Sequence, residues 1–201
     1  MGKRQEAALI TKQKIIEATK ALLEVKSVDD INIEEITNKA GVAKGSFYTY
    51  FKRKEDVVSV IAFMDYEIIR DIVMVSTDSI YEQICVYLKK SVQVIEDKSL
   101  QVAQLWMKSV VAPIEGETAG IMKYQYDMDT IGEILLRAVD HGELKKDTPV
   151  DEIKSNIVNT YYGAVVSWCI MSGEKGKLIK SIDDFCKDAL RVIIEEYVCH
   201  E

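Results

Sequence analysis

The sequence predicts an all-α fold, and three observations support this prediction. Apolar residues recur every three or four positions along most of the 201 residues, which is the period of an α-helix. No segment sustains the alternation of apolar and polar residues that indicates a strand. The two prolines, Pro113 and Pro149, lie where one helix would end and another would begin. We therefore expect about nine helices.

The N-terminal quarter should hold one longer helix followed by two short ones. Apolar side chains at positions 15, 18 and 22 share one face of a first helix of about four turns, and the polar segment 27–31 should form a turn. Asn32 can then cap the second helix in a reciprocal arrangement with Glu35. Gly41 should end that helix, because glycine adopts the left-handed conformation of a helix stop without strain.

The third helix should separate an inner aromatic face from an outer polar one. Phe47 and Phe51 lie four positions apart, so both can point into a small three-helix core. The outward positions offer hydrogen-bond donors but no carboxylate; they are Lys44, Gly45, Ser46, Tyr48 and Thr49. A surface of this kind is typical of a protein that reads DNA.

Three consecutive basic residues, Lys52, Arg53 and Lys54, stand where the next helix begins. Cations are unfavourable there, because the unpaired N–H groups of a helix start already carry about half a positive charge. A bound phosphate would remove the conflict, since the basic side chains and the amide groups could share one anion. The pattern therefore indicates an anionic partner.

The segment AGVAKGSFYTYFKRK, residues 40–54, resembles the helix-turn-helix of TetR-type transcriptional regulators. The usual pattern of that family has a Thr-capped short helix, AGV, a Ser-x-Gly-Thr-like helix start, Y-x-Y-F and a Lys that opens the next helix. This chain departs from it at Asn32, where Thr is commoner, at Ala43, where Ser is usual, and at Arg53, where Ser or Asn is frequent. These departures bear on phosphate contacts and on the choice of operator.

The resemblance implies that the first quarter of the chain binds DNA. The residues expected to contact DNA are Asn32, Lys44, Gly45, Ser46, Tyr48, Thr49, Tyr50 and Lys54. Within this set, Lys44, Ser46 and Thr49 should meet base edges or the groove, while Gly45 allows close approach. The two tyrosines and Lys54 should hold phosphates, with Asn32 contributing from the second helix. Packing of the Tyr50 ring against the core is the alternative for that residue.

Charge is distributed unevenly along the chain. The whole sequence has a net charge of −7, but residues 1–54 hold eleven Lys and Arg against seven Asp and Glu, and residues 55–201 hold fifteen against twenty-six. This asymmetry fits a basic DNA-binding domain over 1–54 and an acidic ligand-binding and dimerisation domain over 55–201. Chance clustering on a solvated surface is the alternative.

Six further helices are expected in the second domain. They should span about 55–76, 79–97, 100–112, 118–141, 149–171 and 181–199. The first is long enough to bridge the two domains. Capping signals support three of the starts, namely Ser79 with Glu82, Thr148 before Pro149, and Ser181 with Asp184.

The last two long helices carry wide apolar surfaces. Their apolar residues are Tyr161, Tyr162, Val165, Val166, Trp168, Cys169 and Ile170 in the first, and Ile182, Phe185, Ala189 and Ile193 in the second. A helix that is apolar over most of its circumference needs partners on more than one side, and the small residues Gly163, Ala164 and Ser167 would allow a close crossing. We expect a homodimer through these helices, as the resemblance also implies. A monomer whose own helices cover both faces is the alternative.

Aromatic and methionine side chains gather in the middle of the second domain. Those expected to line a small-molecule site are Trp106, Met107, Met122, Tyr126, Tyr161 and Tyr162. Aromatic walls and adaptable methionines suit an apolar or planar ligand, which phenol hydroxyls can orient, and the resemblance implies an effector between these helices. An ordinary core is the alternative. Acidic residues nearby would favour a cationic ligand, although a solvated face explains them equally well.

The sequence offers little for catalysis or metal binding. His141 fits a cap at a helix end, and the serines lack a glycine-flanked nucleophile pattern. Neither the four cysteines nor the carboxylates Asp127 and Asp129 show metal-ligand spacing. No uncharged run reaches the roughly 18 residues that cross a bilayer. We expect no enzymatic activity, cofactor, metal or membrane span, and a cytoplasmic protein with reduced thiols.

These observations predict a ligand-responsive transcriptional regulator. We expect a repressor that binds a palindromic operator on double-stranded DNA as a dimer and is released by a small-molecule effector. One alternative is a small-molecule-binding helical bundle, which would show no salt-dependent affinity for DNA. The other is a DNA-organising or adaptor protein, whose DNA binding would ignore small ligands.

Overall fold

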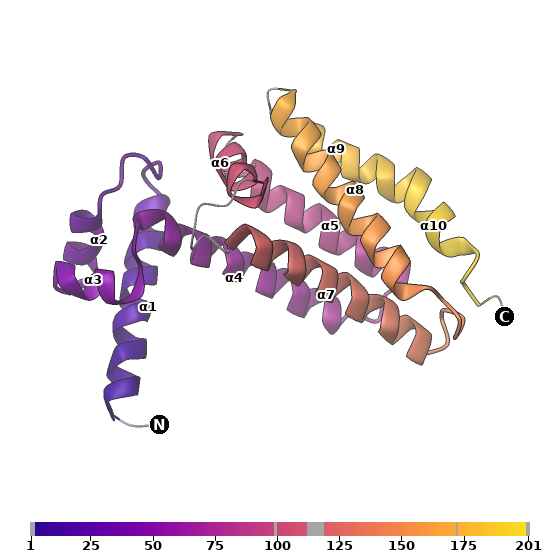
Figure 1. Cartoon of the computed structure of the whole chain (residues 1–201), viewed down its shortest axis with the longest axis horizontal. Coiled ribbons are helices and arrows are strands. Elements are labelled where there is room, and N and C mark those ends of the chain that lie inside the picture. The colour runs from indigo at the N-terminus through magenta and orange to yellow at the C-terminus, as the bar shows by residue number, and fades with distance from the viewer. Residues whose placement is uncertain (1–2, 99, 112–118, 172, 200–201) are drawn as a thin grey trace. The chain divides into compact units, whose positions relative to one another are not determined.

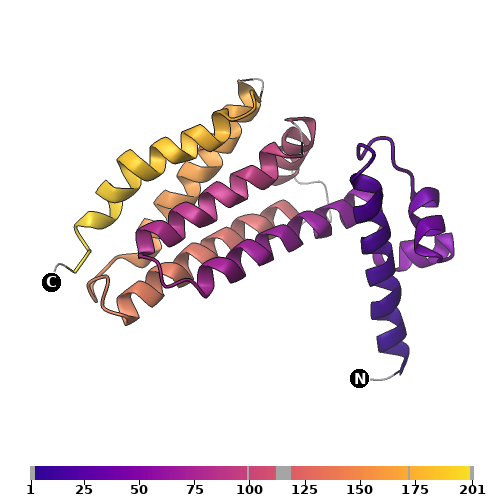
Figure 2. The same cartoon turned by 180° about the vertical axis from the view of Figure 1, so that it is seen from behind.

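The computed structural model describes residues 3–98, 100–111, 119–171 and 173–199, and most of them are helical (Figure 1, Figure 2). The last three helical elements run on without a break, so the described residues contain nine helices, as predicted. The chain divides into two units, residues 1–65 and 66–201. The division falls inside a long helix, later than the boundary at residue 54 expected from the sequence.

The first unit consists of α1 (Lys3–Leu23), α2 (Ile33–Ala40), α3 (Lys44–Tyr50) and the beginning of α4 (Lys54–Met74). Its core is built from Ile15, Ile16, Ile31, Ile36, Phe47, Phe51, Val57 and Ile61. The two phenylalanines point into this core as predicted, with ring centroids 5.6 Å apart. The inner face of α3 is thereby fixed.

Local capping in the first unit follows the sequence predictions. The side-chain oxygen of Asn32 accepts a hydrogen bond from the Glu35 N–H at 2.9 Å, and the Glu35 carboxylate accepts one from the Asn32 N–H at 3.2 Å. Gly41 ends α2 in the left-handed region, with φ +64°. Ala43 precedes α3 and supplies no side-chain hydrogen bond, as expected from the missing hydroxyl.

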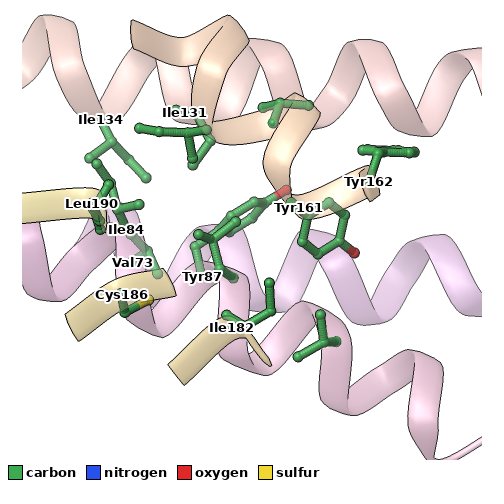
Figure 3. Packing of buried hydrophobic residues seen from close by; sticks show 14 of the residues in the cluster. Val73, Ile84, Tyr87, Ile131, Ile134, Tyr161, Tyr162, Ile182, Cys186 and Leu190 are labelled. Carbon is green, nitrogen blue, oxygen red and sulfur yellow. The ribbon is translucent and has the colours of Figure 1, made fainter. Parts of the chain in front are cut away.

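The second unit contains the rest of α4 and all later helices. These are α5 (Ile80–Glu96), α6 (Leu100–Val111), α7 (Ala119–Asp140), α8 (Val150–Ile170), α9 (Lys177–Asp184), a π-helical turn (Phe185–Leu190) and α10 (Arg191–Glu195). Side chains from α4, α5, α7, α8 and the C-terminal helical stretch meet in one core, which includes Val73, Ile84, Tyr87, Ile131, Tyr161 and Leu190 (Figure 3). Ser79 and Glu82 form the predicted capping box at the start of α5.

Two helix starts differ from the sequence predictions. The C-terminal helix begins at Lys177 and not at Ser181, because the Glu96 carboxylate of α5 caps it. This carboxylate accepts hydrogen bonds from the N–H groups of Gly176, Leu178 and Ile179 at 2.8, 2.8 and 3.1 Å. Helix α8 begins at Val150, one residue after Pro149. The Thr148 hydroxyl does not cap it, because this hydroxyl donates to the Lys145 carbonyl at 2.6 Å.

Much of the apolar surface expected at a dimer interface is covered by the chain itself. Tyr161, Val165, Trp168 and Ile182 are buried in the core of the second unit. This burial covers the inner sides of the two helices and is compatible both with the expected dimer and with the alternative in which one chain covers both faces. Ile170 remains 74% exposed, and Gly163 faces open space, since an added Cβ would meet no atom within 4 Å.

The remaining sequence expectations concern cysteines and the membrane. Cys186 is buried, Cys85 and Cys169 are half-buried, and Cys199 is exposed. Within the described ranges, no cluster of three or more potential metal ligands occurs. None of the helices in the described part of the chain has the length and hydropathy needed to cross a membrane.

Candidate functional site

The outer face of α3 is polar and open. Lys44, Gly45, Tyr48 and Thr49 are exposed and Ser46 is half-buried, while Phe47 anchors the opposite face. A Cβ added to Gly45 would meet nothing within 4 Å, so the space around this residue is open. Of the eight residues expected to contact DNA, Tyr50 is the one that packs partly against the core, which agrees with the alternative considered for it.

A surface hollow of about 590 Å³ lies beside this face and is rich in basic side chains. Its lining includes Asn32, Lys44, Tyr48, Lys52, Arg53 and Lys54, together with the acidic residues Asp29, Glu34 and Glu55. The fold thus brings four of the predicted contact residues together from α2, α3 and the start of α4. The hollow combines cations with phenol and amide groups, the donor types that bind phosphate oxygens.

The expected charge conflict at the start of α4 is absent, and that prediction was wrong. The Asp56 carboxylate accepts hydrogen bonds from the N–H groups of Lys52 and Arg53 at 2.9 and 3.0 Å, and it lies 3.6 Å from the Arg53 guanidinium. The Lys54 ammonium is bound by backbone carbonyls of the loop before α2. Local groups therefore satisfy this helix start without a phosphate, and the basic side chains are held at the edge of the hollow.

Five of the six residues expected to line an effector site are buried or half-buried, and the sixth is exposed. Met107, Tyr161 and Tyr162 are buried, and Trp106 and Tyr126 are half-buried. The Tyr162 ring centroid lies 5.8 Å from that of Trp106 and 5.2 Å from that of Tyr161. Met122 is 58% exposed. The aromatic residues of this set therefore form a cluster, and whether any member contacts a ligand stays a prediction.

A buried ion pair, which the sequence patterns did not predict, lies beside these rings. Lys123 and Asp127 of α7 are bonded to each other, and their side chains are only 3% and 2% exposed. The Tyr87 hydroxyl donates to Asp127 at 2.5 Å, and the Tyr162 hydroxyl donates to it at 3.0 Å. The Lys123 ammonium also lies 3.8 Å from the centre of the Tyr66 ring. Asp127 is thus not part of a solvated face.

A signal for this pair was present in the sequence. Positions 123, 127, 131, 134 and 138 repeat at helical spacing, and Ile131, Ile134 and Ala138 are core residues of α7. A Lys and an Asp in register with that stripe must face inward. A helical pattern based on apolar residues alone does not include this pair, because both residues are charged.

Burial changes the acid–base chemistry of the cluster. Desolvation lowers the pKa of the Lys123 ammonium, against the opposing effect of Asp127. Burial also raises the pKa of Tyr87, Tyr161 and Tyr162 well above the usual range for a phenol, and the nearby Asp127 charge adds to this increase. All three phenols are therefore neutral near pH 7 and remain hydrogen-bond donors.

Comparison with known proteins identifies the first unit. Residues 15–61 match the family model described as bacterial regulatory proteins, tetR family. This match covers the helix-turn-helix and supports the resemblance seen in the sequence. A curated Bacillus subtilis relative, an uncharacterized HTH-type transcriptional regulator named YvdT, is 38% identical to this chain over 50 residues. That alignment spans 25% of the chain and about a quarter, 26%, of the relative.

Solved structures extend the similarity to most of the chain. A transcriptional regulator from Cytophaga hutchinsonii is 16% identical, with a TM-score of 0.68 over 92% of this chain and 97% of that one. Thermus thermophilus FadR, a TetR-family repressor in complex with lauroyl-CoA, is 16% identical, with a TM-score of 0.66 over 94% and 96%. Bacillus subtilis FadR in complex with stearoyl-CoA is 19% identical, with a TM-score of 0.59 over 90% and 97%.

These findings support the predicted resemblance to TetR-type regulators and confirm the predicted all-helical fold. At identities below one fifth, the solved structures establish the shared fold and no more. The matched family and these neighbours are regulators of transcription rather than enzymes. What this chain itself binds has to be argued from its own residues.

Proposed function

We propose that this protein is a DNA-binding transcriptional regulator that presents α3 to the major groove. The observation that carries the proposal is the open, carboxylate-free face of α3 beside a basic hollow. Lys44, Ser46 and Thr49 would meet base edges, and Gly45 would allow close approach. Tyr48, Lys52 and Arg53 would hold phosphates, with Asn32 beside them.

We propose further that two copies act together on a palindromic operator. Two recognition helices of a dimer must enter successive major grooves about 34 Å apart. The exposed side of α8, where Gly163 faces open space and Ile170 is exposed, supports a helix crossing between copies. The interface would then use the outer side of the last two long helices, since their inner sides are already covered by the chain.

The regulator would act in the cytoplasm as a repressor that a small-molecule effector releases from DNA. Helix α4 supports a route for this response, because one continuous helix contributes to both units. Its second half carries Tyr66, which contacts the aromatic cluster through Lys123. A differential affinity of about 1–3 kcal/mol between two states would give roughly 5- to 150-fold release.

The central experiment is selection of bound sequences from random duplex DNA by the purified full chain. We expect a palindrome to be enriched, and we expect Lys44→Gln to lose the enrichment. Lys175→Gln, which changes an exposed lysine of the second unit, is the matched control and should retain it. Failure to enrich any sequence at low salt would refute the proposal and leave the helical-bundle alternative.

The effector response is tested on the selected operator. Candidate ligands are added to the complex and operator release is measured by fluorescence anisotropy, with lauroyl-CoA included because a structural neighbour was solved with it. Transcription from a promoter that carries the operator should fall when the protein is added and recover with the effector. If no ligand in a broad panel changes the affinity for DNA, the adaptor alternative is favoured.

A further inference from the structure

The buried Lys123–Asp127 pair has a fixed member and a displaceable one. Asp127 sits within α7 and is held by phenol donors from two other helices, Tyr87 of α5 at 2.5 Å and Tyr162 of α8 at 3.0 Å. Lys123 reaches the site on a flexible four-carbon stem from near the start of α7. Among the described residues, its ammonium contacts Asp127 and two ring faces, 3.8 Å from the Tyr66 centroid and 5.8 Å from the Tyr161 centroid.

A pair of this kind is not the simplest way to fill a core. Replacing a buried ion pair with apolar residues of similar volume is often neutral or stabilising, so its presence invites a functional explanation. The Tyr161 hydroxyl provides a second, independent observation. This group is buried beside the pair and has no hydrogen-bond partner among the described residues. A bound ligand with a polar group would supply one.

The position of Asp127 among aromatic rings favours a positively charged ligand. If the Lys123 ammonium leaves, a buried carboxylate remains among aromatic faces, which is a receptor for an organic cation. An anion would instead meet the fixed Asp127 charge at close range in a poorly hydrated site, which is unfavourable. Trp106 and Tyr124 pack against Tyr162 at centroid distances of 5.8 and 5.1 Å, so the cation should also carry an apolar or aromatic body.

We propose that the effector is an organic ammonium compound that displaces Lys123 from Asp127. In the absence of this ligand, the Lys123 ammonium occupies the position that the cationic group of the effector would take. The binding site, here called the tyrosine cage, consists of Asp127 with Tyr66, Tyr87, Tyr161 and Tyr162. This inference rests on the proposed function, since it names the chemical class of the effector. If a larger ammonium ligand replaced the Lys123 ammonium, the packing around Tyr66 would change. Because Tyr66 belongs to α4, ligand binding would affect this helix directly.

The first test restores the missing group from solution. Lys123→Ala removes a propylammonium from the side chain, so n-propylammonium should bind the variant and raise its melting temperature in a saturable manner. Neither n-propanol nor propionate should do so. The double variant Lys123→Met with Asp127→Asn replaces the pair by neutral groups of similar size, should fold, and should not respond. An equal response to propanol, or an equal response of the double variant, would refute the cage.

The second test uses the wild-type protein and does not depend on the stability of a variant. Benzyltrimethylammonium should bind saturably, and it should expose Lys123 to a small amine-acylating reagent, detected by mass spectrometry. The alanine variant should bind the probe about tenfold more tightly, because the internal competitor is gone. Saturable binding of decanoate in place of the cation, or a Lys123 that stays protected in the saturated complex, would refute the displacement.

The last measurement separates this inference from the proposed function. With a selected operator in hand, n-hexylammonium and benzyltrimethylammonium should weaken operator binding by the wild-type protein and leave the double variant unaffected. Cation binding without any loss of operator affinity would refute the effector assignment. If selection recovers no operator, the proposed function fails on its own, while the melting and acylation results still decide whether the tyrosine cage binds organic ammonium.

Discussion

The Lys54 ammonium donates a hydrogen bond to the carbonyl oxygen of Ile31 at 2.9 Å. It donates also to the carbonyls of Val28 at 2.7 Å and Asp29 at 3.2 Å, so all three of its N–H bonds are used. Lys54 therefore joins the start of α4 to the loop before α2. A residue that the sequence assigns to phosphate binding also holds the first unit together.

Lys54→Met should destabilise the first unit. Loss of charge-assisted hydrogen bonds to three carbonyls is expected to cost about 1–3 kcal/mol, measured by denaturant unfolding of the full chain. Lys52→Met is the matched control, because Lys52 is exposed and lines the same hollow. We expect the control to keep its stability, to weaken DNA binding evenly across sequences and to reduce the salt slope by about one unit. Equal stability of the two variants would contradict this.

Glu96→Ala should loosen the C-terminal helix. Three N–H groups would lose their acceptor, one of them on the buried residue Leu178, so we expect a loss of about 1–3 kcal/mol in the free energy of unfolding. Amide hydrogen exchange should rise first at residues 176–179. Asp97→Ala changes the exposed neighbour and should have little effect. Unchanged protection at these amides would show that the cap is dispensable.

Acid should destabilise the first unit partly through Glu35. The Lys26 ammonium and the Asn32 N–H lower the pKa of the Glu35 carboxyl below its usual value of 4.5. A lowered folded-state pKa contributes stability that is present above the unfolded-state pKa and is lost as the pH falls through the folded-state value. Glu35→Gln should therefore melt with a weaker pH dependence below about pH 4.5 than the wild type. Melting curves from pH 3 to 7 test this, and parallel profiles would count against it.

Gly163→Leu should affect association and spare the fold. Within one chain an added side chain at this position meets open space, and leucine favours a helix over glycine by about 0.5–1 kcal/mol. The thermal stability at high dilution should therefore hold or rise, while sedimentation velocity should show a weaker dimer. Glu152→Leu at the exposed beginning of α8 is the control. A wild-type protein that is monomeric at operator-binding concentrations would exclude the proposed dimer.

The local part of the candidate site followed from the sequence because short-range physics governs it. The Asn32 and Glu35 cap, the Gly41 stop and the inward Phe47 each depend on residues within a few positions. Asp56 did not enter the prediction for the start of α4, although it lies only four residues beyond Lys52. The basic residues alone suggest an unfavourable charge at this helix start. One carboxylate removes much of this cost, because it accepts hydrogen bonds from two N–H groups there.

The sequence by itself determined the helices, the two-unit division in outline and the polar face of α3, since helical period and capping are local properties. Tertiary structure decided which distant groups meet. Glu96 caps a helix some eighty residues later, and Asp127 receives phenol donors from two other helices. Charge alone would assign both carboxylates to the surface, because only the packed fold removes water from a charge and supplies the donors that replace it.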